Sequence, residues 1–369
     1  MATLVLGSGI VGSAAAWDLV RRGHDVTVAD TDLHSAQETA AAFRARAAHL
    51  DVSDIRALLT RLEEYDIVVS AVPYRFGVSV AAAALTTGTH YLDFGGNPSV
   101  VAAQKRLREK AAAAGVMIIP DCGLAPGLAN VLAEDLIASA SGGTIDSIQI
   151  RVGALPQAPA GALRYQLAFD PAGLINEYAE PCEIIEDGEY TTVEPLTRFE
   201  EVPWDGWGPL EAFSTAGGTS TMAMRHVGRV RSLEYKTLRF PGHGHVFRSM
   251  FELGMFDETP RSVGTATVSR REVLLDALRR TLPSGAPDLV LIRVWRDHKG
   301  ERTTVQVADT DRDGFSALAR TTAFPATALA DLIARGAVSR PGVFTMNEAV
   351  SSEELLPELV SVDIEVEDV

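Results

Sequence analysis

Short apolar runs alternate with amphipathic stretches through the first third of the chain. In these stretches apolar positions recur every three or four residues, the spacing of a helix with one buried face. We expect six buried strands at 4–6, 26–29, 47–50, 66–70, 91–93 and 116–119. Strands that alternate with helices are typical of a doubly wound parallel sheet. The pattern therefore predicts an α/β first domain over residues 1–125.

The pattern changes after this region. Residues 145–152 alternate apolar and polar positions, as does much of 182–202, and turns separate these segments. Strands without regular intervening helices indicate a mixed or antiparallel sheet. We therefore expect a second, α+β domain over 126–320. The acidic tail at 361–369 also alternates, which fits either an edge strand or a disordered end.

Composition narrows the classes of function. The chain has 369 residues, of which 46% are hydrophobic and 22% charged, and its net charge is −16. A duplex-binding surface usually carries a basic stripe, so we expect no nucleic-acid partner. No apolar run approaches the roughly 20 residues of a membrane span, and a strand begins at once, so we expect a cytoplasmic chain without a signal peptide. Cys122 and Cys182 make no disulfide framework. The histidines do not stand at ligand spacing with cysteines or acids, so we expect no metal.

The first apolar run leads into a glycine fingerprint, Gly7-x-Gly9-x-x-Gly12, and then into a helical pattern. In a dinucleotide-binding turn the first glycine allows the tight turn and the second lets the backbone approach the pyrophosphate. The third lets the helix pack close to the strand. The helix N-terminus offers N–H groups and a positive dipole to the phosphates. The alternative is a tight strand–helix turn with no ligand.

An acid stands where the fingerprint requires one. Asp30 ends the second apolar run, about 20 residues on, where a carboxylate can hold the adenosine ribose hydroxyls. A carboxylate there repels a 2′-phosphate, and the next residues are Thr31 and Asp32 rather than arginine. This favours NAD over NADP, although Asp30 could instead be a solvated loop acid. We expect further cofactor contacts at Ile10, Val11, Asp51, Val72 and Pro73.

A basic window stands out in this acidic chain. Residues 225–248 hold six cations and a single acid, Glu234. The cations are Arg225, Arg229, Arg231, Lys236, Arg239 and Arg248. The window is either an ordinary basic strand face or a pocket for a substrate that carries a carboxylate, to which arginine offers a bidentate fork.

Five stretches in their order resemble the saccharopine dehydrogenase family, and within it the lysine 6-dehydrogenase branch. They are GSGIVG at 7–12, VPYRFG at 72–77, DCGLAPGLAN at 121–130, GGTST at 217–221 and YKTLRFPGH at 235–243. Saccharopine reductases tend to carry an E-x-G-L-D-P-G pattern in the third stretch. Here Asp121 and Ala125 fill the two acidic positions. The missing acid at Ala125 counts against saccharopine as the substrate.

The resemblance implies a Rossmann domain and a second domain whose mixed sheet makes a dimer contact, hence a homodimer or higher homo-oligomer. It also implies a C-terminal segment, 321–369, that returns towards the first domain; Thr321–Pro325 matches its start. The implied reaction is NAD-dependent oxidative deamination of the ε-carbon of L-lysine. Its products are ammonia and 2-aminoadipate 6-semialdehyde, which closes to piperideine-6-carboxylate.

This reaction needs proton carriers, because an ammonium group cannot readily lose hydride. The resemblance points to His243 as general base with Lys236 assisting, and histidine has a near-neutral pKa suited to the role. The alternatives without a catalytic role are a turn residue for His243 and a surface lysine on a strand for Lys236. Arg239 is the candidate for the substrate carboxylate, with a surface ion pair as its alternative.

Four further positions are candidates for substrate contact. Thr219 and Ser220 offer hydroxyls to the amino or carboxylate group. Tyr74, at a strand tip, is expected beside the nicotinamide, or simply packed between domains. Asp121 would attract the amine or organise its loop. Cys122 next to it is expected to be a small buried residue.

Two other functions remain open. One is an NAD(P)H-dependent reductase of the same family that joins an amine and a carbonyl compound, as saccharopine- or carboxynorspermidine-forming members do. The other is a dinucleotide-binding regulator without catalysis, in which we would expect the 235–243 stretch to be eroded. That stretch is intact.

Overall fold

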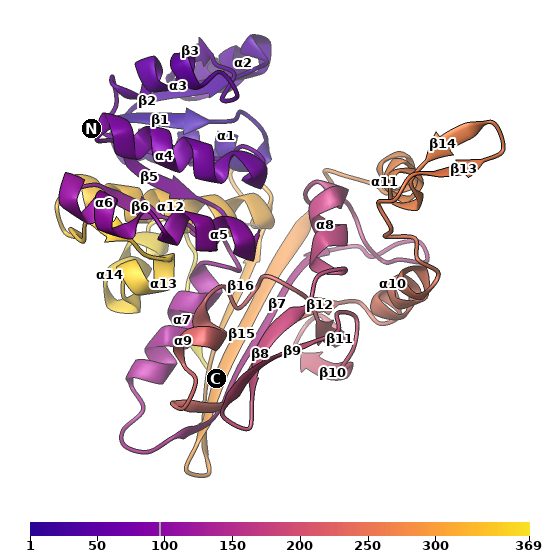
Figure 1. The fold of residues 1–369 in the computed structure, drawn as a ribbon. Coiled ribbons are helices and arrows are strands. Elements are labelled where there is room, and N and C mark those ends of the chain that lie inside the picture. The colour runs from indigo at the N-terminus through magenta and orange to yellow at the C-terminus, as the bar shows by residue number, and fades with distance from the viewer. Residues whose placement is uncertain (96) are drawn as a thin grey trace. The chain divides into compact units, whose positions relative to one another are not determined.

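The computed structural model describes residues 1–95 and 97–369, which form two compact units. The first unit comprises Met1–Ser139 and Ala319–Val366, and the second comprises Ala140–Leu318 and Glu367–Val369 (Figure 1). Each unit has its own sheet.

The first unit extends past the expected boundary at residue 125. Helix α7 (Leu128–Ala138) packs against α13 (Met346–Ala349) and α14 (Ser352–Val360), so it shares a core with the C-terminal segment. Most of its side chains are buried.

The sheet of the first unit has seven strands in the order β17-β6-β5-β4-β1-β2-β3, and every pair is parallel. The strands are β1 (Ala2–Leu6), β2 (Asp25–Asp30), β3 (Arg46–His49), β4 (Ile67–Ser70), β5 (His90–Asp93), β6 (Met117–Ile119) and β17 (Gly342–Val343). The order reverses between β1 and β4, which is where ligands bind in open α/β sheets. The predicted doubly wound parallel sheet is confirmed, and the C-terminal segment supplies its seventh strand.

Helices cover both faces of this sheet. The helices are α1 (Ile10–Arg21), α2 (Leu33–Phe43), α3 (Ile55–Leu62), α4 (Gly77–Thr87), α5 (Pro98–Lys105), α6 (Arg108–Ala114) and α12 (Ala317–Ala334). Helices α3 to α6 pack together over a core that includes Leu58 and Val80. On α1 and α12, Trp17 and Phe324 stack with ring centroids 5.4 Å apart. Helices α5 and α6 are separate because the N–H groups of Arg106 and Leu107 bond to carbonyl oxygens three residues back, at Ala103 and Gln104.

The second unit is built on a nine-stranded sheet. Its strands are β7 (Ile145–Pro156), β8 (Cys182–Glu186), β9 (Glu189–Val193), β10 (Glu200–Trp204), β11 (Gly208–Ser214), β12 (Val230–Arg239), β15 (Asp288–His298), β16 (Glu301–Thr310) and β18 (Glu367–Asp368). Strands β12 and β7 are parallel and the other pairs are antiparallel. The predicted mixed sheet is confirmed, and the acidic tail ends as the edge strand β18.

Helices and one hairpin complete the second unit. They are α8 (Pro171–Glu177), α9 (Met222–Arg225), α10 (His243–Glu252), α11 (Arg270–Thr281) and the hairpin β13 (Arg261–Val263) with β14 (Ala266–Val268). These elements were not predicted from the sequence. Figure 1 shows the hairpin projecting beyond α11. A core of aromatic and aliphatic side chains, among them Tyr178, Phe213 and Phe247, joins α8, β11, α10 and α11.

Strand alternation sorts the residues of β12 onto two faces. Tyr235, Thr237 and Arg239 share one face, and Lys236 faces the other, because successive side chains of a strand point to opposite sides. Phe213 on β11 lies directly opposite Thr237. The face that carries Arg239 therefore meets the aromatic core.

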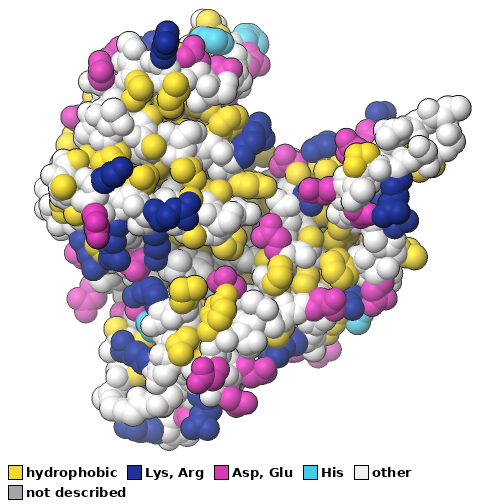
Figure 2. Space-filling view, viewed as in Figure 1, with side chains coloured by type: hydrophobic (Ala, Val, Ile, Leu, Met, Phe, Trp, Pro, Cys, Tyr) yellow, Lys and Arg dark blue, Asp and Glu magenta, His cyan; other side chains and the backbone are white. Residues whose placement is uncertain are grey.

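Surface charge and hydropathy add two observations. Among the described residues no helix is long and apolar enough to cross a bilayer. On the face drawn in Figure 2, acidic and basic side chains are interspersed over the surface.

Candidate cofactor and substrate sites

The glycine turn has the geometry that a dinucleotide requires. Gly7 has a φ of +98°, and a Cβ there would lie 2.9 Å from the carbonyl oxygen of Ala71. A Cβ on Gly12 would overlap the carbonyl oxygen of Gly7. A Cβ on Gly9, in contrast, would meet nothing within 4 Å. Packing thus fixes the first and third glycines, while the second leaves open the space where a pyrophosphate would approach the protein backbone.

The start of α1 is suited to an anion. Gly9 is the N-cap and has no side chain to occupy the free N–H groups, and the first turn carries no acidic residue. Ile10 and Val11 begin the helix, and the side chain of Ile10 is exposed. The N–H groups of a helix's first turn have no intrahelical partner, so they can donate to a pyrophosphate.

Asp30 lies at the end of β2, beside this turn. Its carboxylate accepts hydrogen bonds from Ser8 N (2.7 Å), Ser8 Oγ (2.8 Å) and Asp32 N (2.9 Å). Burial opposes ionisation of Asp30, but the hydrogen bonds from Asp32 and Ser8 outweigh it and lower its pKa. The group is therefore a fixed anion that also ties the glycine turn to β2.

Asp51 follows β3 at the same edge of the sheet. Leu50 N donates to Asp30 O at 3.0 Å, which joins the ends of the two strands. The Asp51 carboxylate is exposed and accepts from Ser53 N (2.8 Å) and Ser53 Oγ (2.7 Å). The Ser53 bonds lower the pKa of Asp51. Two carboxylates thus flank the edge where an adenosine ribose would lie.

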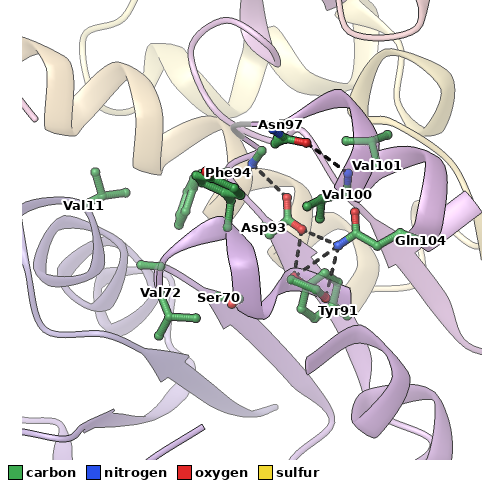
Figure 3. A pocket seen from close by; sticks show the side chains of 14 residues that line it. Val11, Ser70, Val72, Tyr91, Asp93, Phe94, Asn97, Val100, Val101 and Gln104 are labelled. Carbon is green, nitrogen blue, oxygen red and sulfur yellow. Dashed lines mark hydrogen bonds between the residues drawn. The ribbon is translucent and has the colours of Figure 1, made fainter. Parts of the chain in front are cut away.

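A cavity of about 140 Å³ lies at the ends of β4 and β5. Its lining includes Val11 from α1, Val72 and Tyr74 from the segment after β4, and Phe94 from the segment after β5 (Figure 3). The side chain of Tyr74 is 40% exposed. Pro73 precedes Tyr74 as the N-cap of a 3₁₀ turn. The structure thus brings three predicted residues, Val11, Val72 and Tyr74, to one cavity.

Asp93, which was not predicted from the sequence, organises the floor of this cavity. Its carboxylate accepts from Tyr91 Oη (2.8 Å), Gln104 Nε2 (2.7 Å), Gly95 N (2.8 Å) and Asp121 N (3.2 Å), and Figure 3 shows bonds converging on it. A buried carboxylate with four donors holds the adjoining segments in place. The sequence feature that could have identified Asp93 is its position as an acid directly after an apolar run.

Asp121 is buried and has a φ of +61°. A Cβ on Gly95 would overlap its Oδ1, so the two segments meet without space between them. Its neighbour Cys122 is buried, as expected, and burial raises the pKa of the thiol. This placement fits the expected role of Asp121 as organiser of its loop.

In the second unit, Tyr178 joins Arg239 to His243. Its hydroxyl accepts from Arg239 Nε at 3.1 Å and lies 3.0 Å from His243 Nε2. His243 Nδ1 donates to Leu163 O at 2.9 Å, so Nε2 is the acceptor and Tyr178 the donor. All three side chains are buried.

His243 is held as a neutral ring. Burial, helped by the nearby charge of Arg239, lowers the pKa of His243 to about 3. It is the first residue of α10, and Glu211 accepts from Gly242 N (2.8 Å) and Gly244 N (2.6 Å) around it. This geometry favours a positioning role; the predicted general-base role stays a prediction that needs Nε2 to be released from Tyr178.

Arg239 lies in an aromatic and acidic setting that the sequence did not reveal. Its guanidinium lies over the ring of Tyr165, 5.2 Å from the centroid. Burial opposes its charge, but Tyr178, Tyr165 and Glu177 together raise its pKa. Burial raises the pKa of Glu177 to about 7, with Arg239 acting in the opposite direction. No feature of the sequence marked Glu177 or Tyr178 as part of this setting.

Lys236 lies away from this group. It pairs with Glu200 at 3.2 Å and with Glu234 at 3.5 Å on the other face of β12. Arg151 on β7 forms ion pairs with the same two acids. The structure therefore does not bring Lys236 and His243, the predicted catalytic pair, together.

Thr219 and Ser220 lie on a buried loop that follows β11. Thr219 Oγ1 donates to Glu183 O at 3.3 Å, and Ser220 has a φ of +50°. Gly218 packs against the ring of Tyr235. A Cβ on Gly218 would lie 2.5 Å from carbon atoms of that ring. This loop thus lies on the same face of β12 as Arg239.

Two family models match almost the whole chain. The saccharopine dehydrogenase NADP binding domain matches residues 3–119, and the saccharopine dehydrogenase C-terminal domain matches residues 123–364. The chain belongs to the saccharopine dehydrogenase family. Among the described residues, no group of three or more His, Cys, Asp or Glu side chains is placed to hold a metal ion.

Known members of the family differ in length. The NADP-linked, L-glutamate-forming saccharopine dehydrogenase of Saccharomyces cerevisiae is 25% identical over 281 residues, covering 73% of this chain and 62% of that protein. The α-aminoadipic semialdehyde synthase of Rattus norvegicus is 26% identical, over 69% of this chain and 28% of its own. The chain therefore spans less than two thirds of the length of these two relatives.

Two further likenesses extend over the whole chain. Carboxynorspermidine synthase of Vibrio cholerae is 23% identical, covering 94% of this chain and 92% of its own. The structure of apo saccharopine dehydrogenase (L-Glu forming) from Saccharomyces cerevisiae superimposes with a TM-score of 0.80 at 19% identity, covering 100% and 99% of the two chains. At 19% identity the structural likeness shows a shared fold and no more than that.

Proposed function

We propose that the protein is a nicotinamide-dinucleotide-dependent oxidoreductase of the saccharopine dehydrogenase family that acts on the carbon–nitrogen bond of an amino acid. The specific reaction that we propose is oxidative deamination of the ε-carbon of L-lysine with NAD. The observation that carries the substrate class is the setting of the Arg239 guanidinium. Its guanidinium is buried, and among the described residues no hydrogen bond is formed by its Nη2. That nitrogen remains available for a carboxylate.

The preference for NAD rests on Asp30 and its surroundings. The carboxylate is a fixed anion beside the glycine turn, where we propose that it accepts from the ribose hydroxyls. Asp32, two residues on, caps α2 by accepting from His34 N (3.0 Å) and Ser35 N (3.4 Å). Two acids at this edge would repel the 2′-phosphate of NADP.

In the proposed reaction the ε-carbon loses hydride and the ε-nitrogen loses a proton, which leaves an imine. Water adds to the imine, and ammonia departs to leave the 6-semialdehyde. When bound, the nicotinamide supplies the hydride acceptor. Arg239 would hold the α-carboxylate, and the length of the lysine side chain would then set the distance from the guanidinium to the ε-carbon. His243, through Tyr178, would orient the Arg239 guanidinium.

A reductive reaction is the second candidate. The match to carboxynorspermidine synthase extends over nearly the full length of both chains. Such an enzyme would join an amine to a carbonyl compound and reduce the imine with NAD(P)H. A regulator without catalysis is less well supported, because the Arg239 setting within the 235–243 stretch is intact.

The decisive test is absorbance of the reduced nicotinamide with the full chain, L-lysine and either NAD or NADP at alkaline pH. We expect lysine-dependent reduction of NAD, with ammonia released in equal amount. Oxidation of NAD(P)H only when an amine and an aldehyde or keto acid are supplied together would overturn this reaction in favour of the reductive one. Dinucleotide binding without turnover in either direction would support the regulator.

A further inference from the structure

One buried acceptor in the lining of the cavity at the ends of β4 and β5 has no hydrogen-bond partner. Gln104 lies on α5 and is fully buried, and its Oε1 bonds to no described group. Among the described residues of the lining, no other side chain carries a buried polar atom in this condition. Buried polar atoms are nearly always hydrogen-bonded. Gln104 Oε1 is therefore available to a donor from a ligand.

The surroundings of the Gln104 amide fix its orientation. Its Nε2 donates to Asp93 Oδ2 at 2.7 Å and to Gly77 O at 3.3 Å, and Tyr91 Oη lies 3.4 Å from it. If the amide were turned over, its oxygen would face the carboxylate of Asp93 and the carbonyl of Gly77, which are both acceptors. The bonds at Nε2 thus leave Oε1 as the acceptor.

The cavity suits a flat, largely apolar group rather than an anion. Its volume is about 140 Å³, and its walls include Val11, Val72 and Phe94 (Figure 3). Among the described lining residues there is no lysine or arginine. The charged side chain in the lining is Asp93, whose carboxylate is already engaged by four donors. A group that enters would meet apolar side chains and one unpartnered acceptor, Gln104 Oε1.

The cavity adjoins the turn that we propose for the pyrophosphate. Val11 belongs both to its lining and to the first turn of α1, whose N-cap is Gly9. In the sheet order, β4 and β5 lie on one side of the reversal next to β1, and β2, which ends at Asp30, lies on the other. A dinucleotide binds across such a reversal. With the adenosine ribose at Asp30, the nicotinamide half would lie on the side of this cavity.

We propose that Gln104 is a cofactor-binding residue whose Oε1 accepts a hydrogen bond from the carboxamide NH₂ of the nicotinamide. The ring is flat, and its carboxamide carries the N–H donor that Oε1 lacks. The positive charge of the oxidised ring is also compatible with the negative charge of Asp93. This contact rests on the proposed function for the class of cofactor, but it does not depend on which amino acid is oxidised.

The test compares dinucleotides that differ in the carboxamide. In 3-acetylpyridine adenine dinucleotide a methyl group replaces the NH₂, so the carbonyl remains and the N–H donors are lost. ADP-ribose lacks the nicotinamide and reports on the other half of the site. Fluorescence titration of the full chain, without an amino acid substrate, would measure the affinity for each. The 2′-phosphorylated forms are titrated alongside, so that the result does not depend on the choice between NAD and NADP.

The unaltered protein should prefer the carboxamide. A hydrogen bond between neutral groups changes an affinity by a factor of roughly five. We therefore expect NAD to bind about fivefold more tightly than its acetyl analogue. Gln104→Met keeps the length of the side chain but removes Oε1. It should bind NAD about fivefold more weakly, with little change for the acetyl analogue or ADP-ribose, so the preference should disappear.

Tyr91→Phe is the matched control for the support of Asp93. Like Gln104→Met, it removes a donor to the Asp93 carboxylate, but it leaves Gln104 Oε1 in place. It should retain the preference for NAD over the acetyl analogue even where the protein is less stable. Thermal unfolding would check that both variants are folded, and the comparison of ligands on the unaltered protein is decisive without them.

The outcomes separate this contact from the proposed reaction. Equal affinity of the unaltered protein for NAD and its acetyl analogue would overturn the contact. Gln104→Met weakening ADP-ribose as much as NAD would also overturn it and leave Gln104 a structural role. A preference that depends on Gln104, without lysine-dependent reduction of NAD, would retain the contact and reject the proposed reaction. Lysine turnover together with equal affinities would do the reverse.

Discussion

Lys236 and Arg239 lie three residues apart on β12 and point to opposite faces of its sheet. Arg239 bonds to Tyr178 within the aromatic core, whereas Lys236 pairs with Glu200 and Glu234 on the other side. The basic window that looked like one patch in the sequence is therefore divided between two environments. One of them is suited to a ligand, and the other is a network of mutually satisfied charges.

Replacing Lys236 should mainly reduce stability. Lys236→Met leaves Glu200 and Glu234 with fewer cations, and we expect a loss of about 1–3 kcal/mol in the free energy of unfolding, since Glu200 is partly exposed. Urea unfolding would measure it, with kcat for lysine measured on the folded protein. A large fall in kcat at unchanged stability would instead restore Lys236 to the catalytic role that the resemblance implied. Lys110→Met, on the helix α6, is the control for removing a lysine charge.

His243 should make the protein sensitive to acid. Its pKa falls from 6.5 in the unfolded chain to about 3 in the folded one. Between these values the unfolded chain binds a proton that the folded chain does not, so the free energy of unfolding decreases as the pH falls below 6.5. From pH 7.5 to 5.5 this contributes about 1.4 kcal/mol, and the limit below pH 3 is roughly 5 kcal/mol.

The His243 effect can be isolated by comparing variants. His24 and His90 also have pKa values lowered mainly by burial, so the unaltered protein combines several contributions. We expect His243→Asn to be less stable at pH 7.5 but to lose less on acidification, and His245→Asn, at an exposed position, to retain the full loss. Thermal or urea unfolding at both pH values would show this. The same acid sensitivity in all three proteins would mean that His243 is not held neutral.

Cofactor preference should depend on Asp30. Asp30→Asn removes the negative charge but keeps an oxygen to accept from Ser8, so the turn should survive. We expect the ratio of kcat/KM for NAD to that for NADP to fall about tenfold, which corresponds to about 1.4 kcal/mol of lost discrimination. Asp25→Asn, at the exposed start of β2, controls for the charge change. An unaltered ratio in Asp30→Asn would remove the argument for NAD.

The sequence predicted best what lies within one contiguous stretch. Gly7, Gly9, Gly12 and Asp30 could be interpreted together because one strand–turn–helix–strand unit brings them into a fixed relation. The alternation of strands and helices in the first domain was recognisable for the same reason. The mixed sheet of the second domain was predicted from a change of periodicity, but the order of its strands was not predicted.

The contacts among Tyr178, Arg239 and His243 could not be predicted in this way. Tyr178 and His243 are 65 residues apart, and Tyr178 and Arg239 are 61 apart, so only the tertiary fold brings them into contact. Glu177 stands in a short helix with no distinguishing pattern of its own. The role of Asp93 could not be predicted either, because its hydrogen-bond donors Gln104 and Asp121 come from later segments of the chain.

The glycine turn allows a test that separates packing from ligand binding. Gly12→Ala places a methyl group against the carbonyl oxygen of Gly7, so the turn must shift and we expect a loss of stability of about 1–3 kcal/mol. Gly9→Ala meets nothing within 4 Å and its φ is −70°, which suits alanine, so its stability should change by less than about 1 kcal/mol. If the pyrophosphate approaches Gly9, however, the new methyl group should weaken NAD at least about tenfold. Fluorescence titration with NAD and thermal unfolding would compare the two variants. Normal NAD affinity in a stable Gly9→Ala protein would show that the ligand does not cross this glycine, and the open space at Gly9 would then need another explanation.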